Sequence, residues 1–232
     1  MKLVDPLSSS SVLAAWTAGI LSGRGVDDVA AWRMLEYWLQ VELYRAVEAG
    51  AAGVWRHLGE YEQPYFTDTP RSGSKTHTKW IDLVLAEPTL EEPHRIAWIE
   101  LKDLGRSAHT IVANARGLGH DLAALWSLRP AETQETWLNP PAHVIDRGRL
   151  SEWGAFAPAL LRANHLISQI VIVPKSAQES ISADAMEELW LGAFEERAKL
   201  SGSEGGFVVG RAETRQFLVH ALVRGLPQKS ES

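Results

Sequence analysis

Apolar residues recur every three or four positions in four stretches of the chain, which is the spacing that one buried helix face requires. The pattern predicts helices over residues 12–21, 29–49, 107–128 and 183–194. The serine run 8–11 and Ser182 supply side chains that can cap the first and last of these helices. Gly117 and Gly119 lower the helix propensity in the middle of the third. The sequence therefore predicts four packed helices.

A second pattern, rich in β-branched and aromatic residues, predicts strands over residues 61–66, 79–85, 95–102, 165–174 and 217–223. The segment 165–174 is almost continuously apolar, as in a strand that is buried on both faces. Prolines punctuate residues 129–164, which favours loops there. The order of helices, three strands, helix, strand, helix and strand predicts an α/β fold with a mixed sheet flanked by helices on both faces.

The composition narrows the class of protein. The chain has 232 residues, is 45% hydrophobic and carries a net charge of −6, which excludes disorder as its main state. We expect a single domain over residues 1–232, with a helical extension over 1–25 and a loose tail over 226–232. The absence of cysteine excludes disulfides, thiolate metal sites and a cysteine nucleophile, and it fits a cytoplasmic protein. No apolar run is long enough to span a bilayer, so no membrane association is expected.

Two carboxylates are expected to face each other across a hairpin. Apolar residues alternate along 79–85 and 95–102, and this alternation places Asp82 on the same face as Glu100 and Lys102 if the two strands pair antiparallel. Like charges opposite each other destabilise a sheet, so the pair needs neutralisation. A magnesium ion takes one or two carboxylates and keeps several waters, which matches the two acids present. A salt bridge on a solvated sheet face is the alternative reading of the same residues.

These residues resemble the PD-(D/E)xK nuclease superfamily, whose members share a restriction-endonuclease-like αβββαβ core. The resemblance lies in Asp82, followed by Glu100-Leu101-Lys102 on an adjacent strand, and in the element order from about 29 to 175. It implies that Asp82 and Glu100 bind Mg²⁺, with Mn²⁺ as a substitute, and that the Leu101 carbonyl assists. It also implies that Lys102 positions or activates the attacking water. The RecB-like Gln-x-x-x-Tyr element is absent from the following helix, so no branch is assigned.

Members of that superfamily often contribute one more acid from the first helix. Glu42 borders the apolar stripe of residues 29–49 and is the preferred candidate, and Glu36 is the alternative. An ordinary helix-surface acid is the competing interpretation of either residue.

A basic loop precedes the first acidic strand. Arg71, Lys75 and Lys79 occur with no acid between Asp68 and Asp82, and such charge is what phosphate contacts need. A polar hairpin loop without a ligand explains these residues equally well. The resemblance and the loop together predict a magnesium-dependent endonuclease that acts on nucleic acid, with DNA preferred over RNA. A homodimer is a further expectation, because a double-strand cut often uses two copies of one site. A non-catalytic nucleic-acid- or protein-binding module with a nuclease-like fold is the rival.

Overall fold

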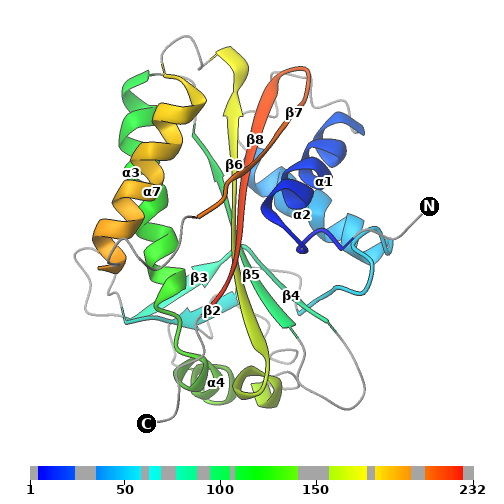
Figure 1. The fold of residues 1–232 in the computed structure, drawn as a ribbon. Coiled ribbons are helices and arrows are strands. Elements are labelled where there is room, and N and C mark those ends of the chain that lie inside the picture. Colours follow the sequence, from blue (N-terminus) through cyan, green and yellow to red (C-terminus); the bar gives the residue numbers. More distant parts are fainter. Residues whose placement is uncertain are drawn as a thin grey trace.

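A six-stranded mixed sheet forms the centre of the protein (Figure 1). The computed structural model describes residues 5–23, 35–58, 63–68, 77–87, 95–104, 108–140, 157–176, 181–199 and 207–226. The strands of the sheet, in spatial order, are β1 (Arg56–His57), β4 (Leu83–Ala86), β5 (Arg95–Asp103), β6 (Asn164–Pro174), β8 (Phe217–Gly225) and β7 (Gly210–Glu213). Strands β5 and β6 run parallel, and every other neighbouring pair in this sheet is antiparallel.

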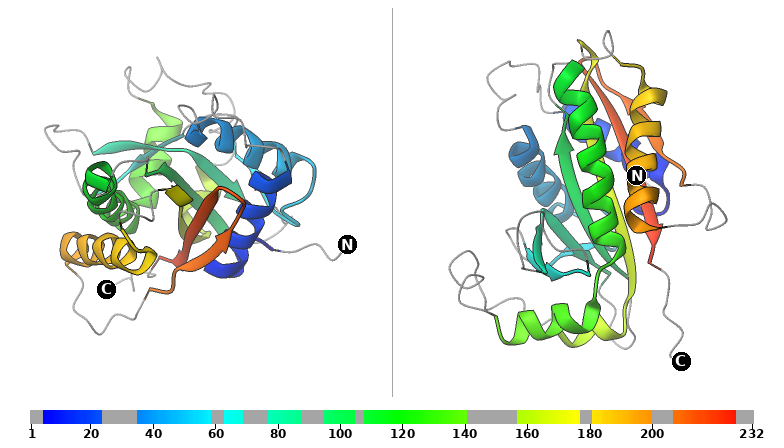
Figure 2. Two further views of the ribbon diagram at one scale, coloured as in Figure 1. Left: turned by 90° about the horizontal axis from the view of Figure 1, so that it is seen from above. Right: turned by 90° about the vertical axis from the view of Figure 1, so that its left-hand side faces the viewer.

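Helices cover both faces of the sheet (Figures 1 and 2). One face carries α1 (Ser10–Gly23) and α2 (Leu35–Glu48), and the other carries α3 (Ala108–Trp126) and α7 (Ala183–Ala198). The antiparallel ribbon of β2 (Gln63–Phe66) and β3 (Thr78–Ile81) forms a second, two-stranded sheet. The short helices α4 (Pro130–Leu138) and η2 (Ala157–Leu161) pack against each other, and α4 also packs on β2.

Side-chain alternation along β5 separates two hydrophobic cores. Ala97, Ile99 and Leu101 point toward α1 and α2, whereas Ile96 and Trp98 point toward α3 and α7. All five are buried, because β5 lies inside the sheet and each of its faces is covered. By the same alternation, the side chains of Glu100 and Lys102 leave β5 on the face of α3 and α7, and near the end of the strand Lys102 also reaches Glu36 on α2.

Helices α3 and α7 pack closely because Gly119 has no side chain. A Cβ at this position would lie 2.5 Å from the Trp190 carbonyl oxygen and 2.6 Å from the Phe194 nitrogen, both on α7. Gly117, about half a turn away and so on the other side of α3, would meet nothing within 4 Å. The glycine that weakens the helical pattern at position 119 is therefore needed for the contact between the two helices.

Most expected elements are confirmed. The mixed α/β sheet, the helices on both faces and the strands within 164–174 and 217–225 match the sequence pattern, and the Ser182 hydroxyl caps α7 by accepting from Ala185 N at 3.2 Å. The expected loop-rich stretch over 129–164 contains helix α4 at Pro130–Leu138 and η2 at Ala157–Leu161, and residues 141–156 of it lie outside the described residues. Pro130 occupies the first turn of α4, where a missing N–H costs nothing. Among the described residues, no helix is both long enough and apolar enough to cross a membrane.

Candidate functional site

The site is built around a bend at Asp82, between β3 and β4. The expected continuous strand over 79–85 was wrong: β3 pairs with β2, whereas β4 pairs with β5 in the large sheet. The bend also changes which face the side chains occupy, since Ile81 packs in the core under α3 and α7 but Leu83 and Leu85 pack under α1 and α2. The register of β4 with β5, in which Leu83 pairs with Ile99, nevertheless places Asp82 opposite Glu100 when continued by one residue.

Asp82 is held in the bend from two sides. One carboxylate oxygen, Oδ2, accepts a hydrogen bond from the Leu101 backbone N–H at 2.7 Å, and the Asp82 carbonyl accepts one from Gln40 Nε2 on α2. The carboxylate is therefore fixed at the edge of β5 beside Glu100, where β4 has not yet begun. An aspartate suits such a position, because its short side chain bonds readily to nearby backbone groups.

Glu100 and Lys102 form a half-buried ion pair next to Asp82. Lys102 Nζ lies 2.7 Å from Glu100 Oε1 and 3.5 Å from Glu36 Oε1, which α2 contributes. The Glu100 side chain is 11% exposed and that of Lys102 is 27% exposed. The structure thus brings Asp82, Glu100 and Lys102 together as expected, and α2 adds Glu36.

The electrostatics of the site show that two carboxylates compete for one positive charge. Burial and the charge of Asp82 raise the pKa of Glu100 to about 8, although the Lys102 ammonium acts in the opposite direction. Burial alone would lower the pKa of Lys102, but Glu100 and Glu36 outweigh it and raise that pKa above its ordinary value. Lys102 therefore stays charged, while the Asp82–Glu100 pair resists carrying two negative charges.

Two further residues belong to this neighbourhood and were missed by the sequence analysis. Asp121 on α3 adds to the rise of the Glu100 pKa. Burial, followed by the charges of Glu100, Asp121 and Asp82, raises the pKa of the fully buried Tyr65. In the sequence, Asp121 is one acid on an amphipathic helix and Tyr65 one aromatic residue of a short strand. Neither residue type nor spacing marks Asp121 or Tyr65 as part of a site. Only the packing of β2 and α3 over β5 brings them near Glu100.

The remaining expected site residues lie elsewhere or outside the description. Lys79 Nζ is 3.9 Å from Asp121 Oδ1, so the basic side chain nearest to Asp82 in sequence faces another acid. Glu42 is buried on α2, and its Oε1 lies 2.8 Å from Arg45 Nη1. Glu36, the alternative candidate, is the acid that contacts Lys102. Arg71 and Lys75 lie outside the described residues. A role for Glu42 in the site stays a prediction.

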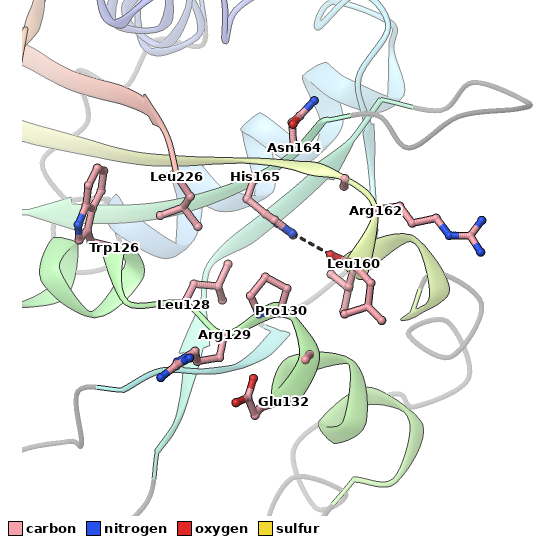
Figure 3. A pocket seen from close by; sticks show the side chains of 13 residues that line it. Trp126, Leu128, Arg129, Pro130, Glu132, Leu160, Arg162, Asn164, His165 and Leu226 are labelled. Carbon is pink, nitrogen blue, oxygen red and sulfur yellow. Dashed lines mark hydrogen bonds between the residues drawn. The ribbon is translucent and has the colours of Figure 1, made fainter. Parts of the chain in front are cut away.

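A cavity of about 590 Å³ lies at the other end of β6, beside Trp126, Leu128 and Arg162 (Figure 3). Its histidine, His165, has both ring nitrogens engaged: Nδ1 accepts from Trp98 Nε1 at 3.0 Å, so Nε2 carries the proton and donates to the Leu160 carbonyl at 2.8 Å. Burial lowers the pKa of His165, which is neutral and holds β6 to η2. This cavity is separate from the carboxylates, because the partner of Glu100 on β6 lies about 13 Å farther along the strand than His165.

Within the described part of the chain, no three or more His, Asp or Glu side chains are arranged to hold a metal ion. In that part of the chain, the two carboxylates that lie opposite each other are those of Asp82 and Glu100. Comparisons of the chain with protein-family models, curated proteins and solved structures found no match.

Proposed function

We propose that the chain is a restriction-endonuclease-like, magnesium-dependent nuclease that hydrolyses phosphodiester bonds in DNA. The observation that carries this proposal is the fixed position of Asp82 opposite Glu100, with the ammonium of Lys102 2.7 Å from Glu100. The element order supports it as well. After helix α2, the large sheet takes up β1, β4 and β5 as an antiparallel meander, and helix α3 and the parallel strand β6 come later in the chain, in the order αβββαβ, while β2 and β3 form a separate ribbon.

The donor chemistry at the site fits a hard divalent cation. Asp82 and Glu100 provide carboxylate oxygens, and magnesium is bound in many proteins by one or two carboxylates together with waters. The raised pKa of Glu100 shows that the pair is short of positive charge, which is the electrostatic condition that favours such an ion. When bound, the ion supplies a Lewis acid that lowers the pKa of a water. Mn²⁺ has similar ligand preferences and should replace Mg²⁺.

The chain's own residues would hold and orient the reacting groups. The Leu101 N–H holds the Asp82 carboxylate and Gln40 holds the Asp82 backbone carbonyl, so the geometry does not need to form during the reaction. Lys102 stays protonated and, next to Glu100, presents a fixed positive charge where negative charge develops on the phosphate. Glu36 Oε1, 3.5 Å from the same ammonium, is a second acid beside it.

The test is cleavage of supercoiled and linear DNA with Mg²⁺ or Mn²⁺, beside binding in Ca²⁺. Lys102→Ala should lower the cleavage rate at least a hundredfold and keep most of the affinity, since the lysine acts on the developing charge. Lys175→Ala is the matched control, because Lys175 pairs with an acid on the surface, Glu213, at 2.8 Å. Asp82→Asn should abolish the rise of the melting temperature that Mn²⁺ produces in the wild type.

The rival is a non-catalytic module that binds nucleic acid or protein. Wild-type protein that binds DNA but cuts neither DNA nor RNA with any of these metals would establish the rival and refute the nuclease. Equal cleavage by wild type and Lys102→Ala would show that the activity arises elsewhere in the chain or from a contaminant.

A further inference from the structure

Gln63, the first residue of β2, is buried, and its side chain forms no hydrogen bond with the described residues. It is 0% exposed, and neither its Nε2 nor its Oε1 has a partner among the residues that the structure describes. Burying an amide in this way is unfavourable, because both atoms lose their bonds to water and receive none in return. In most proteins such a group either binds an ordered molecule or serves a function.

Gln63 lies beside the segment that carries Asp82. Gln63 pairs with Ile81, the residue before Asp82, and it shares a face of the β2–β3 ribbon with Tyr65 two residues along. Tyr65 and Ile81 both pack in the core under α3 and α7, which is also the face of β5 that carries Glu100, so the Gln63 side chain lies in the same layer as Glu100. Burial and the charges of Glu100, Asp121 and Asp82 raise the pKa of Tyr65, which agrees with this placement.

A second buried glutamine shows what a structural role looks like in this protein. Gln169 on β6 is also 0% exposed, but its Oε1 accepts from Trp190 Nε1 at 2.8 Å and its Nε2 donates to the Leu118 carbonyl at 3.3 Å. It connects β6 to α3 and α7. Gln63 makes no such connection among the described residues, although it is equally buried.

We propose that Gln63 is a positioning residue whose side-chain amide binds a water ligand of the divalent cation held by Asp82 and Glu100. This inference rests on the proposed function. Magnesium gives up its waters reluctantly, so a site with two carboxylates keeps several of them, and each needs an acceptor. The Gln63 Oε1 offers an acceptor without adding a further negative charge to a group of acids. Such outer partners of a metal typically change its affinity 10- to 100-fold.

The experiment compares Gln63→Met with Gln169→Met, two changes of the same size in equally buried positions. Melting temperatures are measured in EDTA, and Mn²⁺ affinity is measured by electron paramagnetic resonance of the free ion. Gln63→Met should melt at or above the wild-type temperature in EDTA and bind Mn²⁺ at least tenfold more weakly. Gln169→Met should melt lower, because it breaks a satisfied network, and it is compared for stability alone, since Gln169 pairs with Glu100 across β5 and β6. Lys175→Ala, in the exposed pair with Glu213, is the affinity control and should bind Mn²⁺ as the wild type does.

The two proposals can fail separately. Wild-type protein that binds no Mn²⁺ refutes the metal site and this inference together. If Asp82→Asn abolishes binding while Gln63→Met stays within threefold of wild type, the metal site stands and the role of Gln63 is refuted. Should Gln63→Met not fold in EDTA, Gln63→Asn, which keeps the amide but shortens it by one methylene, is held to the same affinity threshold.

Discussion

Replacing Glu100 by glutamine should stabilise the metal-free protein at high pH and leave it unchanged at low pH. Glu100 is nearly isosteric with glutamine, and its pKa rises from 4.5 to about 8 in the folded protein because of burial and the neighbouring Asp82. Between these two values the folded state holds a proton that the unfolded state has released. The free energy of unfolding of the wild type therefore falls as the pH rises from about 4.5 to 8 and levels off above.

The size of the effect follows from the pKa difference. One pKa unit corresponds to about 1.4 kcal/mol, so ionised Glu100 should cost the wild type about 4 kcal/mol more at pH 9 than at pH 5. For a chain of this length, that equals a change of roughly 10 °C in melting temperature. Glu100→Gln should melt within a few degrees of wild type at pH 5 and roughly 10 °C above it at pH 9.

The assay is thermal unfolding followed by circular dichroism, in EDTA, at both pH values. Glu213→Gln is the control, because Glu213 forms an exposed pair with Lys175 at 2.8 Å and such pairs contribute about 1 kcal/mol at most. The reasoning is refuted if Glu100→Gln melts below wild type at pH 9. That result would mean that the ion pair with Lys102 stabilises the fold more than the two carboxylates destabilise it.

Two further predictions concern the helices on the α3 and α7 face. Gly119→Ala should lower the free energy of unfolding by about 1–3 kcal/mol, because its Cβ would meet the backbone of α7. Gly117→Ala should raise that free energy by up to about 1 kcal/mol, because its Cβ meets nothing. Urea unfolding measures both changes, and changes of the same sign would contradict the packing. Burial alone would raise the pKa of Glu187, but hydrogen bonds from His220 and Arg211 outweigh it and lower that pKa. The stability that Glu187 adds should be complete above pH 4.5 and lost as the pH falls below it. In Glu187→Gln the melting temperature should therefore fall less steeply than in the wild type as the pH is lowered below 4.5. An equally steep fall would rule this out.

The candidate site depended on both local pattern and tertiary packing. Alternation along 95–102 placed Glu100 and Lys102 on one face from the sequence alone, since this property belongs to any strand. The face assigned to Asp82 was derived by assuming a continuous strand over 79–85. That strand does not exist, because the chain bends at Asp82 and passes from one sheet to the other. Asp82 still reaches Glu100, and the hydrogen bond from Leu101 N–H shows how.

Periodicity determined the long helices α3 and α7, the strands β5, β6 and β8, the mixed sheet and the two helical layers, because the spacing of apolar residues is a local record of which side of each segment is buried. It did not determine which acid of α2 meets Lys102, or that Asp121 and Tyr65 lie near Glu100. Nor did it show that Gln63 is buried without a hydrogen-bond partner among the described residues. These facts depend on how β2, α2 and α3 pack on β5. Charged and amide side chains that meet across different elements leave no periodic signal in the chain. The sequence therefore predicted that Asp82 and Glu100 lie together, whereas only the tertiary structure showed which residues surround them.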